Sequence, residues 1–301
     1  MKKDALWMRA NVVTAVRNFF AVRGFLEVET PALIPANAPE EHINPVVTLP
    51  WQLQTSPELC MKRLLCRGYE RLFQISRCWR NGERGIQHLP EFTMLEWYRS
   101  GRNYNDLMTD CEELLQHIAR ECIPDRPVYC HNSLEIDPFT PWQRMSLSEA
   151  FVRFANINVR VCLEKGLYED ILSDVVEPAL SKFSSPVFLY DFPVELAALS
   201  RVKPDDSDYA ERFELYVGGL ELANAFSELN DPQEQRKRFE EVNLARAKAG
   251  QATMQLPERF LAELETMPPS AGIALGVDRL IMLVTGAESI DQVVAFTPED
   301  L

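Results

Sequence analysis

The sequence lacks the features that mark a membrane protein, a disulfide-linked scaffold or a zinc protein. It has no uncharged apolar run of about 18 residues, so no transmembrane helix is expected. Asp4 and Arg9 interrupt the N-terminal segment, which argues against a signal-peptide core. The seven cysteines are scattered without a CxxC pair, and their odd number indicates reduced thiols. We therefore expect a cytoplasmic protein without membrane contact.

The common nucleotide-binding motifs and the charge pattern of nucleic-acid binders are also missing. Neither GxGxxG nor GxxxxGK[ST] occurs, so a Rossmann or P-loop site has no support. The formal net charge is −14 and no basic stripe is present, whereas neutralisation of phosphates drives nucleic-acid binding. Stable tRNA binding is therefore not expected, although an acidic chain can still place a few arginines around a phosphate.

What is present is an ordinary globular composition with regular apolar patterns. Helical patterns cover residues 6–23, 57–65, 103–122, much of 146–185, 231–250 and 277–286. Strand patterns cover residues 25–31, 71–79, 91–98, 186–193, 213–217, 220–226 and 272–276, with a loop at 32–50 and a small hairpin around Asn132-Ser133. Helices and antiparallel hairpins alternate without a regular βαβ rhythm. The pattern predicts an α+β fold built on a mainly antiparallel sheet.

The predicted hairpin over 213–226 brings two glutamates together. If Gly218-Gly219 is a two-residue turn, Val217 pairs with Leu220 and Tyr216 with Glu221. Glu214 then lies on the same face as Glu221, one diagonal away, at roughly 7–8 Å between Cα atoms. Two such carboxylates plus substrate phosphates suit Mg²⁺. The alternative is a pair of solvent-facing glutamates on an edge hairpin.

The segment GVDRL places an arginine where an anion could bind. Arg279 falls in the first turn of the last predicted helix, directly after a strand that ends in glycine. Helix N-termini attract anions, and a guanidinium adds a planar fork for phosphate oxygens. A surface ion pair between Asp278 and Arg279 is the alternative explanation.

The loop RNGERGIQHLPEF, which joins the strands 71–79 and 91–98, combines cations with an aromatic residue. Arg80 leaves the first strand and could clamp a phosphate, and Phe92 could stack on a base. Glu83, Arg84 and His88 lie where a flexible loop could close over a charged substrate. A solvated hairpin tip is the alternative.

Together these segments resemble the three signature motifs of class II aminoacyl-tRNA synthetases. GFLEVETPAL resembles motif 1, which forms the dimer interface in that family, so a homodimer is implied. FQISRCWRNGERGIQHLPEFTMLEWY resembles motif 2, the ATP-binding hairpin, and AGIALGVDRLIML resembles motif 3. The motifs occur in the family's order and span nearly the whole chain. The resemblance implies the catalytic core of that class, with ATP and Mg²⁺ as cofactors.

The segments TSPE, HLPEFTMLEWY and LELANAFSELNDPQEQRKRF are similar to the cores of lysyl-tRNA synthetases. The resemblance implies that Glu58 holds the α-ammonium of lysine, and that Glu228 with Tyr98 holds the side-chain ammonium. An ammonium group that leaves water needs such charged partners. The other substrate-binding residues that it implies are Ser56, Pro57 and Ala225.

For ATP, the resemblance implies that Arg80 binds the α-phosphate and Arg279 the γ-phosphate, both as catalytic residues. Phe92 and Arg279 would sandwich the adenine, and Glu214 and Glu221 would carry Mg²⁺. The remaining ATP-binding residues that it implies are Asn81, Gly82, Glu83, His88, Leu89, Leu222 and Gly276.

The segment that resembles motif 1 begins about twenty-five residues from the start of the sequence, so we expect no N-terminal anticodon-binding OB domain. We expect one catalytic domain over 1–301, with a helical insertion at about 146–185. MKRLL, HLPEFTMLEWYR and GVDRLIML closely resemble the elongation factor P–lysine ligase family. That resemblance implies adenylation of lysine or (R)-β-lysine and its transfer to a lysine side chain of elongation factor P.

Three positions depart from the text of that family. Gly82 replaces the glutamate of the RNE sequence that is common in that family, so Glu83 or a backbone carbonyl would contact the adenine instead. Leu89 replaces the asparagine of HNPEF, which removes one polar contact with ATP. Ala225 replaces the glycine of ANGF, and a methyl group at the pocket floor would change which lysine isomer fits.

Three other functions stay open. A truncated lysyl-tRNA synthetase-like enzyme would charge tRNA without an anticodon domain. An amide synthetase similar to asparagine synthetase A would need a cationic residue for an aspartate side chain, whereas these motifs supply Glu58 and Glu228. A non-catalytic core that binds lysine or a partner protein for regulation would explain Gly82 and Leu89.

Overall fold

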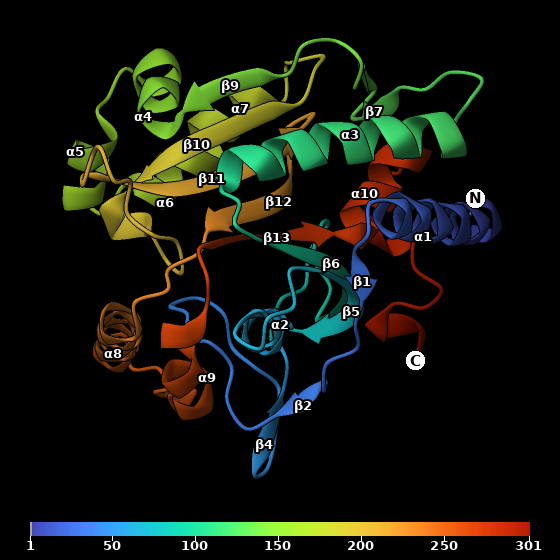
Figure 1. The fold of residues 1–301 in the computed structure, drawn as a ribbon. Coiled ribbons are helices and arrows are strands. Elements are labelled where there is room, and N and C mark those ends of the chain that lie inside the picture. The colour runs from blue at the N-terminus through green and yellow to red at the C-terminus, as the bar shows by residue number, and fades with distance from the viewer. Residues whose placement is uncertain (1) are drawn as a thin grey trace.

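A single eight-stranded sheet runs through the centre of the computed structural model, which describes residues 2–301 (Figure 1). In sheet order the strands are β1 (Leu26–Glu27), β5 (Arg71–Trp79), β6 (Glu91–Ser100), β13 (Ser270–Gly276), β12 (Leu220–Ser227), β11 (Tyr209–Val217), β10 (Val187–Pro193) and β9 (Gln143–Ser146). Neighbouring strands are antiparallel except for the pairs β1–β5 and β9–β10. The predicted α+β fold with a mainly antiparallel sheet is confirmed.

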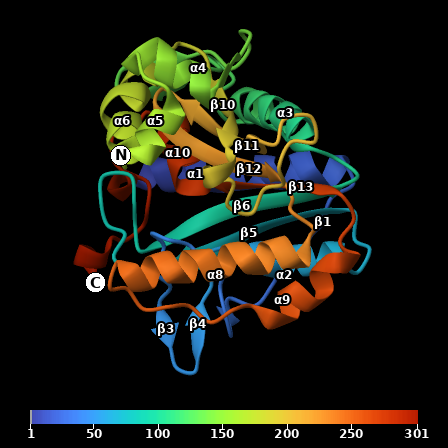
Figure 2. The ribbon, with the colours of Figure 1, turned by 90° about the vertical axis from the view of Figure 1, so that its left-hand side faces the viewer.

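Three helices cover one face of the sheet and enclose the largest apolar core (Figures 1 and 2). They are α1 (Lys2–Val22), α3 (Tyr104–Cys122) and α10 (Val277–Thr285). In α1 the helical spacing of Val12, Val16, Phe19 and Phe20 places all four side chains in this core. Burial of these side chains stabilises the helix against the sheet. The cleft described below lies on the opposite face of the sheet.

The opposite face carries α2 (Glu58–Leu65), α8 (Pro232–Lys248) and α9 (Glu258–Glu263) (Figure 2). Beneath them lies a small sheet of β2 (Leu33–Ile34), β4 (Trp51–Leu53) and β3 (Val47–Thr48). The helix α8 is strongly charged, as the sequence predicts, but it is more than a solvated surface helix. Its Phe239 and Arg246 are buried, and one side of it forms a wall of the cleft.

The segment expected to be helical at 146–185 forms four short helices beside β9 and β10. They are α4 (Leu147–Ala150), α5 (Val159–Glu164), α6 (Tyr168–Ile171) and α7 (Glu177–Leu180), with π-helical turns at Phe151–Ala155 and Leu172–Val176. The hairpin predicted at Asn132-Ser133 is β7 (Tyr129–His131) with β8 (Leu134–Ile136). Short 3-10 turns occupy Val194–Leu196, Leu264–Thr266, Ile290–Gln292 and Pro298–Asp300.

The hairpin of β11 and β12 turns at Gly218-Gly219, as predicted, with Val217 opposite Leu220 and Tyr216 opposite Glu221. Both glycines have positive φ, and a Cβ at Gly219 would lie 2.5 Å from the Cβ of Ser181. A bulge then shifts the register, so that Leu215 pairs with Ala223 and Glu214 with Asn224. The prediction of a regular hairpin missed this bulge, which follows from packing and not from the turn.

The sequence also predicts reduced cysteines and no transmembrane helix. All seven cysteines are free thiols in the structure. Within residues 2–301, no helix is both long and apolar enough to cross a membrane.

Candidate active site

A cleft of about 830 Å³ opens on the face of the sheet that carries α8. Eleven of the residues predicted for the site line it. They are Ser56, Glu58, Arg80, Glu83, His88, Leu89, Phe92, Glu221, Leu222, Gly276 and Arg279. These residues come from four separate parts of the chain, so the fold gathers them. The cleft has two ends of different character. One end carries cations, and at the other Ser56 and Glu58 border a cluster of buried carboxylates behind the lining.

At the first end, two arginines face the cleft from the end of β5 and the start of α10. Arg80 directly follows β5, and its guanidinium lies 5.1 Å from the ring centroid of Phe92. Its Nη1 lies 3.8 Å from the Glu83 carboxylate, too far for a strong ion pair. Arg80 therefore keeps a guanidinium that can turn toward an anion.

Arg279 lies at the N-terminus of α10, as predicted, and contacts both the hairpin loop and β12. Its Nη1 donates to the backbone oxygen of Glu221 at 2.6 Å and lies 3.4 Å from the Glu221 carboxylate. Its Nη2 lies 2.7 Å from His88 Nε2. Burial and the positive charge of Arg279 lower the pKa of His88, so the neutral imidazole can accept this hydrogen bond. An incoming anion would compete with His88 and Glu221 for the guanidinium.

The start of α10 is fixed by an aspartate that the sequence interpretation had treated as a surface residue. Asp278 is buried, accepts a hydrogen bond from the backbone N–H of Thr93 at 2.6 Å, and pairs with Arg9 from α1. The interpretation of Asp278 and Arg279 as a surface ion pair is therefore wrong. Asp278 ties α10 to β6 and α1, and this positions Arg279 over the cleft.

Glu214 on β11 lies deeper and already has partners. Arg212 Nη2 lies 2.7 Å from its Oε1, and the hydroxyl of Tyr216 donates to its Oε2 at 3.0 Å. Burial raises the pKa of Glu214, and the carboxylate of Glu221 adds to the rise, whereas Arg212 opposes it. The structure thus keeps Glu214 and Glu221 in electrostatic contact, and a cation between them would relieve their repulsion.

At the other end of the cleft, a buried lysine lies between two of the predicted carboxylates. Lys62 Nζ lies 2.5 Å from Glu58 Oε1 and 2.5 Å from Glu228 Oε2. Burial alone would lower the pKa of Lys62, but Glu228 and Glu58 raise it above its ordinary value. Lys62 was not predicted as a site residue, although its place one helical turn after Glu58 is the spacing of an ion pair.

A third buried carboxylate, that of Glu96, was also missed. It accepts hydrogen bonds from Ser56 Oγ at 2.5 Å and from the Tyr98 hydroxyl at 2.7 Å. Burial and the neighbouring Glu58 raise the pKa of Glu96 to about 8. The signal was available, because an acidic residue in the middle of the apolar strand 91–98 needs a partner for its charge.

The base of this end is closed by a glycine on β13. A Cβ at Gly272 would lie 2.2 Å from Glu228 Oε1 and 2.2 Å from Tyr98 Cε1. Only a residue without a side chain lets Glu228 and Tyr98 approach the backbone of β13 so closely. Gly272 therefore shapes the acidic end.

Some predicted residues do not reach the cleft. Ala225 is wholly buried in the large core behind the sheet, whereas its neighbours Asn224 and Phe226 line the cleft. Since side chains alternate along a strand, the expectation that Ala225 forms the pocket floor is wrong. The other predicted residues outside the lining of the cleft are Pro57, Asn81, Gly82, Tyr98, Glu214 and Glu228. Asn81 donates its backbone N–H to the oxygen of Asn44 at 2.7 Å.

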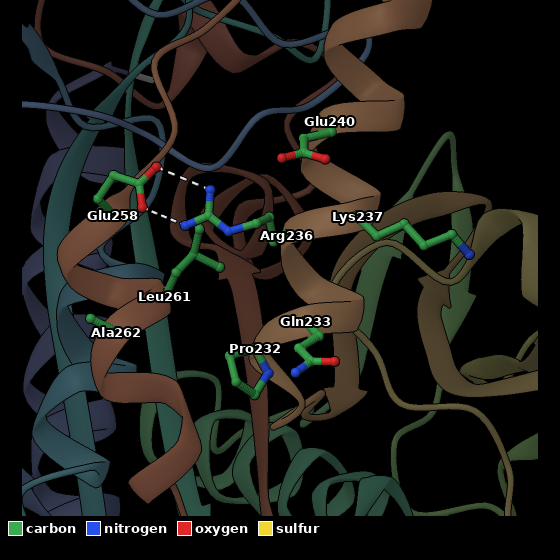
Figure 3. A pocket seen from close by; sticks show the side chains of 8 residues that line it. All are labelled: Pro232, Gln233, Arg236, Lys237, Glu240, Glu258, Leu261 and Ala262. Carbon is green, nitrogen blue, oxygen red and sulfur yellow. Dashed lines mark hydrogen bonds and ion pairs between the residues drawn. The ribbon is translucent and has the colours of Figure 1, made fainter.

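A second, more open hollow of about 370 Å³ lies between α8 and α9 (Figure 3). Figure 3 shows Arg236 reaching from α8 to the carboxylate of Glu258 on α9. Leu261 and Ala262 form the apolar side of the hollow. Arg236 is thus already paired, and Lys237 lines both this hollow and the cleft.

The comparison with known proteins agrees with this geometry. Residues 1–300 match the family model of the class II tRNA synthetases (D, K and N). An elongation factor P–(R)-β-lysine ligase from Klebsiella pneumoniae subsp. pneumoniae is 41% identical over 309 residues, covering 97% of this chain and 94% of that protein.

Two further relatives carry the same name. That from Haemophilus influenzae strain PittGG is 41% identical, covering 98% of this chain and 95% of that protein. That from Avibacterium paragallinarum is 40% identical, covering 99% of this chain and 96% of that protein. The chain therefore belongs to the class II tRNA synthetases, and within them to the family of the elongation factor P–(R)-β-lysine ligases.

Proposed function

We propose that the protein is an ATP-dependent ligase that adenylates lysine or (R)-β-lysine and joins it by an amide bond to a lysine side chain of elongation factor P. The names of the relatives support this substrate and acceptor. The observation that carries the proposal is the charge at the acidic end of the cleft.

Three carboxylates meet at that end, those of Glu58, Glu96 and Glu228, and one ammonium group, that of Lys62. When all are ionised, two negative charges remain without a partner. Lysine and β-lysine each carry two ammonium groups, so either substrate neutralises the acidic end. An aspartate side chain would add a further negative charge, which argues against an amide synthetase similar to asparagine synthetase A.

The first step forms an aminoacyl-adenylate. Glu58 and Glu228 hold the two ammonium groups, and the substrate carboxylate then points toward Arg80. A carboxylate oxygen attacks the α-phosphorus of ATP, and the bond from that phosphorus to pyrophosphate breaks. Arg80 stabilises the charge that develops on the α-phosphate. Arg279 gives up its contact with His88 and binds the γ-phosphate. Phe92 and Arg279 enclose the adenine.

Glu214 and Glu221 fit a magnesium site. Within residues 2–301, no cluster of three or more acidic, histidine or cysteine side chains could hold a metal without help. Mg²⁺ often binds one or two carboxylates and completes its shell with substrate phosphates, as this pair would require. When bound there, Mg²⁺ would neutralise phosphate charge.

In the second step, a lysine amine of elongation factor P attacks the acyl carbon, the amide bond forms and AMP leaves. We place this reaction in the cytoplasm and expect a homodimer through the segment around Pro31, which resembles motif 1. Non-catalytic lysine binding is the less economical alternative, since Arg80, Glu214, Glu221 and Arg279 all occupy places that ATP chemistry needs.

The deciding experiment mixes the protein with ATP, Mg²⁺, labelled lysine or (R)-β-lysine, elongation factor P and total tRNA. Label that protease destroys and ribonuclease leaves intact is the expected result. Label that ribonuclease destroys would identify a lysyl-tRNA synthetase-like enzyme instead. If neither elongation factor P nor tRNA becomes labelled and no pyrophosphate is released, the non-catalytic regulatory core is favoured.

A further inference from the structure

Glu40 is a carboxylate of the cleft to which the proposed function assigns no task. Glu40 lies in the loop between β2 and β3, and its half-buried side chain lines the cleft. Among the described residues, its carboxylate has no hydrogen bond or ion pair. A carboxylate held partly out of water without a partner is costly, which suggests a task that needs it free.

The loop that carries Glu40 is held rigidly by α8. Arg246 is only 2% exposed, and its Nη1 donates to the backbone oxygen of Glu40 at 2.9 Å. The same guanidinium contacts the backbone oxygen of Ile43 at 3.3 Å and Asn44 Oδ1 at 2.7 Å. A buried arginine thus fixes the backbone of this loop, from which the Glu40 side chain reaches the cleft.

Glu40 lines the cleft together with Arg80 from one end and Glu58 from the other. Burial raises the pKa of Glu40 to about 7; Arg80 opposes the rise, and Glu58 adds to it. Arg212 and Glu83 are the other charged neighbours, with one lowering and one raising the pKa. In the proposed function, Arg80 holds the α-phosphate and Glu58 the α-ammonium. The acyl carbon of the adenylate lies between those two groups, and Glu40 is close to both.

We propose that Glu40 is the general base that deprotonates the acceptor amine in the second step. This inference rests on the proposed function. The acceptor arrives as an ammonium ion, R–NH₃⁺, which has no lone pair for attack. One proton passes to the Glu40 carboxylate, and the amine nitrogen then attacks the acyl carbon. The C–N bond forms, the C–O bond to the phosphate breaks and AMP leaves with that electron pair. The nitrogen gives its second proton to solvent.

This task suits the chemistry of the site. A general base works best when its pKa is near the working pH, and Glu40 meets that condition. Glu58, Glu96 and Glu228 are committed to ammonium groups or to hydrogen bonds, and Glu214 is bound to Arg212. Glu40 remains free to exchange a proton with an amine, and it lines the cleft together with both Arg80 and Glu58.

The test separates the two half-reactions of Glu40→Gln, with Glu265→Gln as the control because Glu265 is exposed and lies outside the lining of the cleft. Pyrophosphate exchange measures adenylate formation and should stay within twofold of wild type for both variants. Preformed adenylate is then mixed with elongation factor P in a single turnover. Transfer should fall about 100-fold in Glu40→Gln alone, the typical contribution of a general base.

Two further readouts distinguish a base from a merely structural residue. Hydroxylamine is uncharged at neutral pH, so Glu40→Gln should consume adenylate with hydroxylamine as fast as wild type. Wild-type transfer to elongation factor P should rise with pH and level off above about 7. In the variant this plateau should vanish, and the rate should continue to rise toward the pKa of the free amine.

Transfer by Glu40→Gln within threefold of wild type, or an equal loss of pyrophosphate exchange, would overturn the role of Glu40. Failure of the proposed function looks different. In that case the wild-type adenylate reacts with hydroxylamine while elongation factor P stays unlabelled. Glu40 is then tested with n-butylamine as the acceptor, where the same 100-fold difference supports the base and an equal rate refutes it.

Discussion

The two ends of the cleft are built in opposite ways. At the acidic end, Lys62 and Glu228 are almost fully buried and their charged atoms lie 2.5 Å apart. At the other end, the Arg80–Glu83 and Arg279–Glu221 pairs measure 3.8 and 3.4 Å, and all four side chains are partly exposed. A buried network selects by shape and charge and cannot rearrange cheaply, whereas loosely paired cations can change partners. We infer that the acidic end recognises the amino acid. The end with Arg80 and Arg279, called the arginine end below, binds and releases the phosphates of ATP in each catalytic cycle.

We expect the largest effect from a substitution at the arginine end. Arg80→Ala should reduce adenylate formation by about 1,000-fold, because it removes a donor aimed at charge that develops on the α-phosphate. Pyrophosphate exchange measures the effect, and thermal unfolding should change little because the side chain is partly exposed. Arg77→Ala is the control, since Arg77 lies on the same strand with its side chain 54% exposed and only a 3.8 Å contact to Glu91. Near-normal exchange in Arg80→Ala would contradict the assignment.

A change at the acidic end should instead act on the amino acid alone. Glu228→Gln keeps the shape of the side chain and removes one charge, so the KM for lysine or β-lysine should rise about 100-fold. The KM for ATP should stay within about threefold, because Glu228 lies outside the arginine end. Steady-state kinetics with each substrate varied in turn provide the measurement, and Glu265→Gln on the exposed surface is the control. An equal rise in both KM values would show that the two ends are not separable.

The acidic end should also make substrate binding depend on pH. Burial raises the pKa of Glu96 to about 8 and also raises the pKa of Glu228, so the empty site holds protons at pH 7. A dication favours the ionised carboxylates, and binding therefore releases those protons. Affinity should rise by up to about tenfold per pH unit for each proton released, and level off above pH 8.

The same shifts predict the sign of the stability change. Because the raised pKa of Glu96 belongs to the folded state, the folded protein binds more protons than the unfolded chain between about pH 4.5 and 8. The free energy of unfolding of the empty enzyme should therefore fall as pH rises through that range, and lysine should restore it. Calorimetry in buffers of different ionisation enthalpy measures the released protons. Binding without proton release at pH 7 would refute this part of the comparison.

The sequence predicted the arginine end better than the acidic end, for a physical reason. Arg80 and Arg279 follow from local signals, since each stands at the junction of a regular element and a loop. Lys62 and Glu96 lie inside a helix and a strand, where their meaning depends on which other elements pack against them. Local signals mark both residues, but they do not identify the partners, which depend on tertiary packing.

The errors have similar causes. Ala225 was assigned to the pocket because it replaces the glycine of ANGF in the similar family, and the structure buries it in the core behind the sheet. Asp278 was treated as a surface residue because its partners Arg9 and Thr93 are distant in sequence. The bulge after Tyr216 escaped prediction because turn chemistry fixes only the first pairs of a hairpin. Local rules thus gave the sheet and its hairpins, and tertiary contacts decided which face each residue occupies.

We expect the smallest effect from a substitution at the tip of the loop between β5 and β6, which belongs to the arginine end. Arg84 Nη2 lies 2.9 Å from Asp291 and 2.9 Å from Glu299, so the tip is fastened to the C-terminal segment. The nearby backbone bond from the Ile290 N–H to the oxygen of Ile86 adds to this contact.

Because the Arg84 pairs are exposed, Arg84→Met should raise the KM for ATP by less than about fivefold and leave the KM for lysine unchanged. Raising the salt concentration should weaken the wild type toward the variant, since exposed pairs are screened. Kinetics at low and high salt measure both effects. A large, salt-independent loss of ATP affinity would mean that the loop tip is part of a rigid network like the acidic end, and that the arginine end is not the adaptable half of the cleft.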